Sequence, residues 1–285
     1  MNLKTAVLLA GGFGTRLKSL FPDTAKPLVP IAGKPFIEHL VSSFQQLGIQ
    51  HLVLCLGYKS ESFSESIKNF EQAGLQVTVS LEQSPLGTGG AIRQAKNFLP
   101  ANAPVLIANA DTYFHGSLDQ LFLLEPKDLG SVGLFQVPDI SRFGSVNFTG
   151  NQVNSFQEKS GHGPGFVSSG LVVLTPRALQ ELPAAEAFSF EKDFLHPQAQ
   201  RFNAVPLEGT FFDIGLPSSY AEFNALKVFE TLSNDQKREL KRALQQKPNG
   251  PQAENKNLEQ LNLSQSLSWI QPSLEHLTKE FLDSL

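Results

Sequence analysis

Residues 5–17 read TAVLLAGGFGTRL, a short apolar run that leads directly into three closely spaced glycines. The apolar run predicts a buried strand, because it is too short for a typical helix. Glycines placed directly after a strand let backbone N–H groups approach a phosphate chain closely. Leu17 stands where a Walker loop has its second glycine, and no Gly-Lys-Ser/Thr follows. The stretch therefore predicts a phosphate-binding turn that is neither a Walker loop nor a dinucleotide-binding loop.

The sequence around this turn continues to alternate between strand-like and helix-like patterns. The predicted strands are 51–56, 76–81 and 104–108, and the predicted helices are 35–47, 60–70 and 91–98. Such alternation implies right-handed crossovers and a mainly parallel sheet. Ligands of these sheets bind beyond the carboxyl ends of the strands. We therefore expect Gly11–Arg16, Glu82–Gly90 and Asn109–Asp111 on one rim of the sheet.

The second half of the chain has a different pattern, with Gly and Asn turns between short strands. Strands are predicted at 131–137, 144–148, 153–157 and 166–174, and helices at 176–182 and 217–246. The expected fold is an α/β, Rossmann-like three-layer α/β/α sandwich with a mainly parallel mixed sheet and a C-terminal helical extension. We expect a catalytic domain at 1–225 and the extension at 226–285. A linker is expected near 247–256, where Pro and Gly gather.

The extension carries apolar residues at helical spacing from Ile270 to Leu285. They predict a helix that packs on its own domain or forms a contact in a homo-oligomer.

Composition restricts the class of protein. The net charge of −4 over 285 residues argues against an extended nucleic-acid surface, which is usually basic. The single cysteine, Cys55, lies in an apolar strand-like run and is expected to be a buried small side chain. The sequence has no apolar run of about 18 residues, so no membrane span is expected. The apolar run near the N-terminus is too short to be the core of a signal peptide. We expect a cytoplasmic protein.

Charged residues near the predicted rim suit phosphate and metal chemistry. Arg16 offers a bidentate fork and Lys26 a point charge beside the glycine turn. Asp111 follows a predicted strand, and Asp213 lies far downstream. Two carboxylates from distant segments suit Mg²⁺, which binds a few protein oxygens together with phosphates and water. Taken alone, Arg16 or Lys26 could also be a surface charge, and either aspartate could also be a helix cap.

The glycine turn followed by Lys26-Pro27 resembles the signature of the sugar-1-phosphate nucleotidylyltransferases, and the resemblance extends to about Ala225. It departs at Ala25, where the family has proline. The resemblance implies an enzyme that joins a nucleoside triphosphate to a sugar 1-phosphate and releases pyrophosphate, with Mg²⁺ as its cofactor.

Site residues follow from this resemblance position by position. The catalytic residues would be Arg16, Lys26, Asp111 and Lys159, with Mg²⁺ on Asp111 and Asp213. The nucleotide-binding residues would be Leu9, Ala10, Gly11, Gly12, Gly14, Thr15, Glu82, Pro85, Gly87 and Thr88. The sugar phosphate would contact Asn109, Gly144, Glu158, Lys159, Ser169 and Gly170. The structural alternatives are that Thr88 caps a helix and that Glu158 and Lys159 form a solvated surface pair.

Glu82 favours guanine among the bases. A carboxylate accepts two hydrogen bonds side by side, matching guanine N1–H and N2–H₂, whereas uracil and thymine offer one N–H there. Several segments, among them 21–27 and 188–195, resemble the D-glycero-α-D-manno-heptose 1-phosphate guanylyltransferases in particular. One alternative is a UTP- or dTTP-dependent enzyme acting on a hexose 1-phosphate. Another is a catalytically silent regulatory subunit that binds NDP-sugars.

Overall fold

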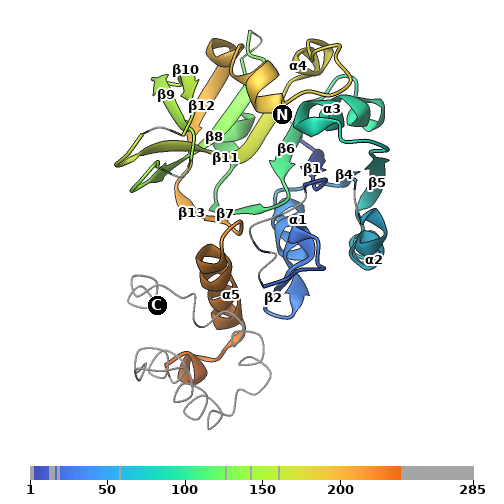
Figure 1. Cartoon of the computed structure of the whole chain (residues 1–285), viewed down its shortest axis with the longest axis vertical. Helices are drawn as coiled ribbons and strands as arrows, with labels where there is room; N and C mark the ends of the chain where they lie inside the picture. The colour runs from blue at the N-terminus through green and yellow to red at the C-terminus, as the bar shows by residue number, and fades with distance from the viewer. Residues whose placement is uncertain are drawn as a thin grey trace. The chain divides into compact units, whose positions relative to one another are not determined.

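The chain folds into two compact units, which are described separately (Figure 1). The first joins Met1–Phe13 to Ile37–Phe211, and the second joins Gly14–Phe36 to the chain from Phe212 onward. The computed structural model describes residues 3–12, 17, 20–57, 59–125, 127–141, 143–159 and 161–238. The predicted C-terminal helix and the linker near 247–256 lie outside these residues.

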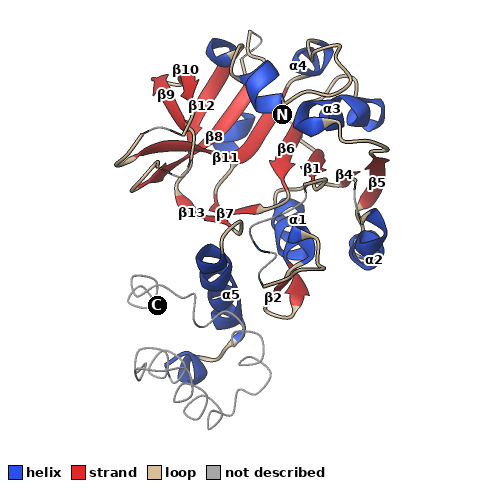
Figure 2. Cartoon of the chain, viewed as in Figure 1, coloured by secondary structure: helices blue, strands red, loops and turns tan. Residues whose placement is uncertain are grey.

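A nine-stranded sheet forms the first unit (Figure 2). Its strands are β1 (Thr5–Leu9), β4 (His51–Leu56), β5 (Gln76–Leu81), β6 (Val105–Asn109), β8 (Gly130–Val137), β9 (Ser145–Thr149), β10 (Gln152–Gln157), β11 (Gly165–Leu174) and β12 (Phe202–Pro206). Their order is β5-β4-β1-β6-β11-β8-β12-β10-β9. The strands β5, β4, β1 and β6 run parallel, as the alternating pattern predicts.

The remaining strands make the sheet mixed, as expected, and most of their pairings are antiparallel. β11 pairs antiparallel with both β6 and β8, and β10 pairs antiparallel with β9 and β12. The sheet is therefore mixed, and its parallel order is concentrated in the N-terminal half. Short turns join β9 to β10, and such turns connect antiparallel neighbours, whereas parallel neighbours need a long crossover.

Helices of the first unit pack against this sheet, whereas the last of the described helices belongs to the second unit. The described α-helices of the chain are α1 (Phe36–Gln46), α2 (Ser64–Gln72), α3 (Gly87–Ala95), α4 (Pro176–Gln180) and α5 (Pro217–Thr231). Ala6, Val7 and Leu8 of β1 are all completely buried. Because successive residues of a strand point to opposite faces, both faces of β1 are covered, as in a three-layer arrangement.

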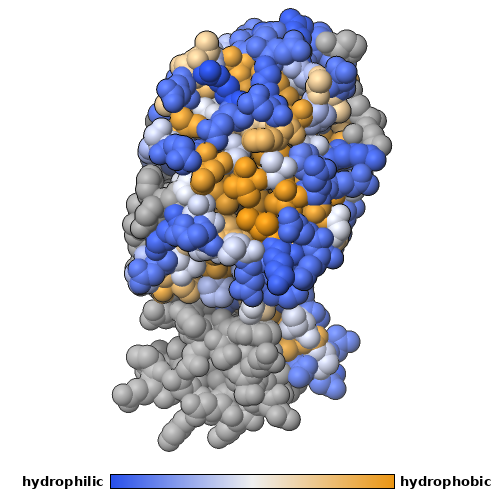
Figure 3. Space-filling model, turned by 90° about the vertical axis from the view of Figure 1, so that its right-hand side faces the viewer, coloured by the Kyte–Doolittle hydropathy of each residue, from blue (hydrophilic) through white to orange (hydrophobic). Residues whose placement is uncertain are grey.

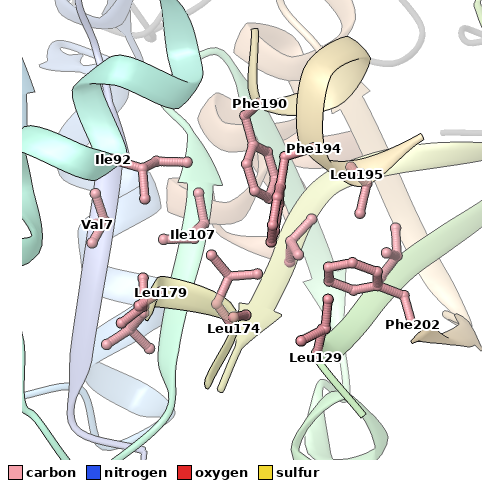
Figure 4. Close-up of a cluster of buried hydrophobic side chains, with 14 of the residues drawn as sticks. Val7, Ile92, Ile107, Leu129, Leu174, Leu179, Phe190, Phe194, Leu195 and Phe202 are labelled. Atoms are coloured by element: carbon pink, nitrogen blue, oxygen red, sulfur yellow. The ribbon is translucent and has the colours of Figure 1, made fainter. Parts of the chain in front are cut away.

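The core on the α3 face is shown in Figure 4. Val7 of β1 and Ile107 of β6 meet Ile92 of α3, and Phe194 packs in the same buried cluster. Phe194 belongs to a π-helical turn, η6 (Phe190–Leu195), and its ring lies 6.2 Å from that of Phe202 in β12. This cluster fixes the strand ends beside α3, where the predicted ligand rim begins.

The second unit is held together by polar contacts to α5. Tyr220 donates its hydroxyl to the Pro30 carbonyl at 2.7 Å, and the buried Asn224 side chain accepts the Ala32 N–H at 2.8 Å. Ala32 has a left-handed φ of 46°, and the bond from Asn224 helps to hold that strained residue. The short strands β2 (Pro30–Ile31) and β3 (Lys34–Pro35) belong to this unit, whereas β7 (Thr112–Gly116) pairs with β13 (Gly209–Asp213).

The edge of the large sheet presents apolar surface. β5 ends the sheet, and its Val79 and Leu81 side chains are about 40% exposed, at 39% and 43%. Figure 3 views the side of the molecule on which α2, α3 and β5 lie, and apolar residues gather in the middle of that face. Among the described residues, no helix combines the length and the apolar character needed to cross a lipid bilayer.

Candidate functional site

A cavity of about 500 Å³ opens at the carboxyl ends of β1, β4 and β5 in the first unit. This is the rim at which parallel sheets bind ligands. The predicted nucleotide-binding residues that line it are Leu9, Gly11, Gly12, Glu82, Pro85, Gly87 and Thr88. The structure therefore brings together two predicted segments that lie about 70 residues apart in the sequence. Of the other predicted members, Ala10 is buried and does not line this cavity, while Gly14, Thr15 and Arg16 lie outside the described residues.

Five lining residues were not in the predicted nucleotide-binding set: Cys55, Gly57, Gln83, Ser84 and Ala91, of which the last three lie within or next to the predicted segment Glu82–Gly90. Gly57 directly follows β4, so the rule that identified the other strand ends would have found it. Cys55 is buried, as predicted, yet it also lines the cavity. Burial and the negative charge of Glu82 raise the pKa of the Cys55 thiol to about 12. The thiol therefore stays protonated and serves as an apolar surface, and not as a nucleophile.

Glu82 makes two hydrogen bonds to main-chain groups, one through its backbone and one through its carboxylate. Its own N–H donates to the Leu56 carbonyl at 2.8 Å, and its Oε2 accepts the Leu86 N–H at 3.1 Å. A methyl group added to Gly11 would lie 2.9 Å from Oε1. Each carboxylate oxygen can accept more than one hydrogen bond, so the Leu86 contact leaves acceptor capacity for a base. The carboxylate is thereby held in one orientation at the cavity wall.

The start of α3 is capped by a distant segment. Gly89 and Gly90 donate their N–H groups to the Phe188 carbonyl at 3.0 and 3.4 Å, and Thr88 Oγ1 accepts the Phe190 N–H at 2.9 Å. The predicted alternative, in which Thr88 caps its own helix, is not what the structure shows. Since these first amides of α3 already bond to protein, this helix start shapes the cavity wall and does not offer those amides to a phosphate.

Asn109 and Gly170 of the predicted sugar-phosphate set lie side by side. Gly170 adopts a left-handed φ of 76°, and an added side chain there would lie 2.9 Å from Asn109 Nδ2. Asp111, half-buried, follows directly after β6. Ser169, in contrast, is fully buried, and its hydroxyl donates to the Gly133 carbonyl at 2.9 Å. Its side chain is turned into the sheet, so only its main chain could meet a ligand.

The other predicted sugar-phosphate residues follow β10 and border β9. A methyl group added to Gly144 would lie 2.8 Å from the Gln157 carbonyl, which places Gly144 against the residue before Glu158. Glu158 and Lys159 are exposed. Glu158 Oε1 lies 3.2 Å from Lys192 Nζ, a partner that the sequence did not suggest. Lys192 belongs to η6, so this π-helical turn reaches the predicted sugar-phosphate segment.

The second unit brings together two predicted phosphate and metal residues. Lys26 Nζ lies 3.5 Å from Asp213 Oδ1, and both side chains are largely buried, with 12% and 26% exposed. The Gly215 N–H donates to the same Asp213 oxygen at 2.8 Å. An added side chain at Gly215 would lie 3.0 Å from Lys26 Nζ. The close approach explains why glycine follows the Asp213-Ile214 pair.

Hard carboxylate oxygens at Asp111 and Asp213 fit the ligand chemistry of Mg²⁺. Asp111 belongs to the first unit and Asp213 to the second. Within the ranges that the structure describes, no group of three His, Cys, Asp or Glu side chains could hold a metal by itself.

Comparisons with known proteins agree with this chemistry. The sequence profile of the Nucleotidyl transferase family matches residues 5–228. A D-glycero-alpha-D-manno-heptose 1-phosphate guanylyltransferase of Campylobacter jejuni is 38% identical over 76% of this chain and 97% of its own. That of Aneurinibacillus thermoaerophilus is 33% identical over 75% of this chain and 94% of its own. The crystal structure of HddC from Yersinia pseudotuberculosis, complexed with GMP-PN, is 32% identical with a TM-score of 0.70. It covers 79% of this chain and all of that one.

Proposed function

Because the chain belongs to the Nucleotidyl transferase family, we propose that it transfers a guanylyl group from GTP to D-glycero-α-D-manno-heptose 1-phosphate, in the cytoplasm. The products would be the GDP-heptose and pyrophosphate. The relatives from Campylobacter jejuni and Aneurinibacillus thermoaerophilus, both named for this reaction, support the assignment. The observation within the chain that carries it is the oriented Glu82 carboxylate on the wall of the cavity.

Glu82 supports the choice of base. The Leu86 N–H fixes the carboxylate, so it can meet two adjacent donors of a base without first reorienting. Guanine presents N1–H and N2–H₂ side by side, whereas uracil presents one N–H next to a carbonyl. A carboxylate facing that carbonyl would lose a hydrogen bond and repel the oxygen, which disfavours UTP and dTTP.

The chemistry of the reaction requires no general base. A sugar 1-phosphate is already an anion at neutral pH, so the barrier is the approach of two anions. We assign Lys26 and Lys159 to the transferred and attacking phosphates, and Arg16 to the pyrophosphate. When bound by Asp111 and Asp213, Mg²⁺ would supply a further positive charge at the reacting phosphate. The cationic residues would lower the barrier by positioning the reactants and neutralising their charge.

Charged residues at the predicted phosphate site argue against a catalytically silent subunit. Such a subunit is expected to lack these charges, whereas this chain carries Arg16, Lys26, Asp111 and Asp213.

Glu82→Gln tests the proposed function. A glutamine offers one acceptor and one donor, which matches uracil or thymine better than guanine. Pyrophosphate release should be followed with GTP, UTP and dTTP, each with heptose 1-phosphate and with hexose 1-phosphates, and with or without a magnesium chelator. We expect wild-type turnover to require GTP, heptose 1-phosphate and Mg²⁺. In Glu82→Gln, kcat/KM for GTP should fall about tenfold or more, since a hydrogen bond to a charged group is worth roughly 1.5–3 kcal/mol.

Glu71→Gln is the matched control, because Glu71 is exposed at the end of α2 and does not line the cavity. Its kinetics should equal those of the wild type. Wild-type turnover with UTP or dTTP in preference to GTP would refute the base assignment. GDP-sugar binding without any turnover would instead support the silent subunit.

A further inference from the structure

Residues 184–190, which we call the strap, lie against the start of α3. The Phe188 N–H donates to the Leu86 carbonyl at 3.0 Å, and the Phe188 carbonyl accepts the Gly89 and Gly90 N–H groups described above. Arg93 of α3 also donates to the carbonyls of Ala184 and Ala185. The strap is therefore joined to the cavity wall along its length, although about 100 residues separate the two in the sequence.

The contact is so close that only glycine fits on the α3 side. An added side chain at Gly87, which has a left-handed φ of 69°, would lie 2.6 Å from the Phe188 carbonyl oxygen. An added side chain at Gly89 would overlap the Phe188 ring, and one at Gly90 would overlap the Glu186 carbonyl. The glycines of this helix start are thus required by the strap, in addition to any approach of a ligand.

The strap is anchored firmly at its C-terminal end. Phe188 and Phe190 are buried in the core cluster, and Figure 4 shows Phe190 beside Phe194. Ser189 caps η6 by accepting the Lys192 N–H at 3.2 Å, while the Ser189 N–H donates to Asp193 Oδ2 at 2.7 Å. A segment held at this end can act as a rigid support for the wall that it touches.

Hydrogen bonds continue from the strap to the base-selecting carboxylate. Phe188 bonds to the carbonyl of Leu86, and the N–H of Leu86 bonds to Glu82 Oε2. Gly87 and Thr88, which line the cavity, lie against Phe188 and Phe190. The positions of the Glu82 carboxylate and of residues 86–88 therefore depend on the main chain of Phe188, which the burial of the Phe188 ring holds in place.

We propose that Phe188 is a positioning residue that sets base selectivity, by holding residues 82–90 in the shape that admits guanine. The inference rests on the proposed function, since it concerns the same cavity. Phe188 does not line the cavity itself. Loosening the strap should let Glu82 and Gly87 shift. The preference for GTP over UTP should therefore fall more than the rate of turnover, because the residues predicted to contact the phosphates belong neither to the strap nor to residues 82–90.

The test compares Phe188→Ala and the milder Phe188→Leu with the wild-type full-length chain. Steady-state kinetics with GTP and with UTP give the ratio of the two kcat/KM values, and calorimetry gives the ratio of the two affinities without turnover. We expect the GTP preference to fall about tenfold in Phe188→Ala and less in Phe188→Leu, because one oriented hydrogen-bonding group is affected. The KM for the sugar phosphate should change less than the GTP preference.

Phe148→Ala is the matched control. Phe148 is a partly buried phenylalanine of β9 that packs at 5.0 Å on Phe166, at the edge of the same core. It should lower the melting temperature without changing the ratio of GTP to UTP. A general loss of stability would lower both activities equally, so the ratio separates positioning from folding.

Gly89→Ala adds a second measurement. The added methyl group should disturb Phe188 and lower the GTP preference, and the double variant Gly89→Ala/Phe188→Ala should recover part of that loss, because the ring that caused the overlap is gone. Additive losses in the double variant would count against the proposal.

Folded Phe188→Leu with an unchanged ratio, by kinetics and by affinity, would overturn the inference about the strap. Equal binding of GTP and UTP by the wild type would also overturn it, because there would be no selectivity to set. Base-selective binding that Phe188→Leu weakens, without pyrophosphate release in any protein, would support the strap and refute the proposed reaction.

Discussion

Gly11 and Glu82 show how a single missing side chain can shape a binding cavity. The space that an alanine methyl group would occupy at position 11 is taken up by Glu82 Oε1. For Gly12, the next residue, no atom of the described residues, apart from its chain neighbours, lies within 4 Å of such a methyl group. Of these two adjacent glycines, Gly11 is therefore the one that makes room for a protein carboxylate.

Gly11→Ala is predicted to displace the Glu82 carboxylate and to reduce the preference for GTP over UTP. The Glu82 side chain can swing away, so the melting temperature should change little, but its bond to the Leu86 N–H should weaken. We expect the ratio of the two kcat/KM values to fall about tenfold. Glu71→Gln, at an exposed residue that does not line the cavity, is the control, and it should leave this ratio unchanged. An unaltered ratio in Gly11→Ala would mean that the carboxylate is not placed by this contact.

At the scale of elements, an ionic clamp connects α4 to the short helix η7 (Ala199–Arg201) that precedes β12. Arg201 donates to both oxygens of Glu181, at 2.6 and 2.9 Å, and Arg177 donates to Oε1 at 2.8 Å. The hydrogen bonds from Arg201 and then from Arg177 lower the pKa of Glu181 to about 2. Because the group is solvent-exposed, its contribution to stability is small, at about 1 kcal/mol or less.

The clamp should make stability depend on pH in acid. A carboxyl whose pKa is lower in the folded state stabilises the fold above its unfolded pKa of about 4.5, and this contribution is lost as the pH falls towards 2. Glu181→Gln should therefore be less stable than the wild type at pH 6, with the difference vanishing near pH 2. Urea unfolding at a series of pH values measures this, with Glu71→Gln as the control. A difference that is constant with pH would contradict the assignment.

The elements also show where sequence reasoning succeeds. The strands β1, β4, β5 and β6 were predicted to within a residue or two, because a buried parallel strand carries a short continuous apolar run bounded by turns. The position of the cavity was predicted as well, because ligands of parallel sheets bind beyond the carboxyl ends of the strands. The strap could not be predicted, because its contacts are mostly main-chain hydrogen bonds between distant segments. Almost any residue type can form such bonds, so the sequence does not indicate which segments they join.

The direction of the Ser169 side chain could not be predicted for a different reason. Its side-chain direction depends on the register of β11, which shifts between Ser168 and Val172 where it pairs with β8. A shift of one residue exchanges the faces of a strand, so spacing alone could not show that the hydroxyl points into the sheet.

Considered as a whole molecule, the chain distributes the predicted chemistry over its two units. The base cavity, Asn109 and Asp111 belong to the first unit, and Lys26 and Asp213 belong to the second. Lys26 and Asp213 are 187 residues apart in the sequence, yet they form an ion pair because the chain returns to the second unit after completing the first. The family resemblance, confirmed by the comparisons, predicted both residues but not their contact.

The chain after residue 238 should be dispensable for turnover. The family profile ends at residue 228, and the relative from Campylobacter jejuni is matched over 97% of its length by 76% of this chain. A protein that ends at residue 238 should therefore retain kcat within about twofold of the full chain. Its pyrophosphate release and its sedimentation should be compared with those of the full-length protein. A large loss of kcat would assign residues 239–285 to the active enzyme.

The buried thiol of Cys55 has a practical consequence. Since it is the only cysteine and its proton is held so tightly, maleimide dyes and spin labels should leave the natural molecule unmodified at neutral pH. A cysteine introduced on either unit would then be the only reactive thiol. Two introduced cysteines, one on each unit, could carry fluorescent or spin labels. The distance between these labels could be measured as substrates are added, without labelling of Cys55.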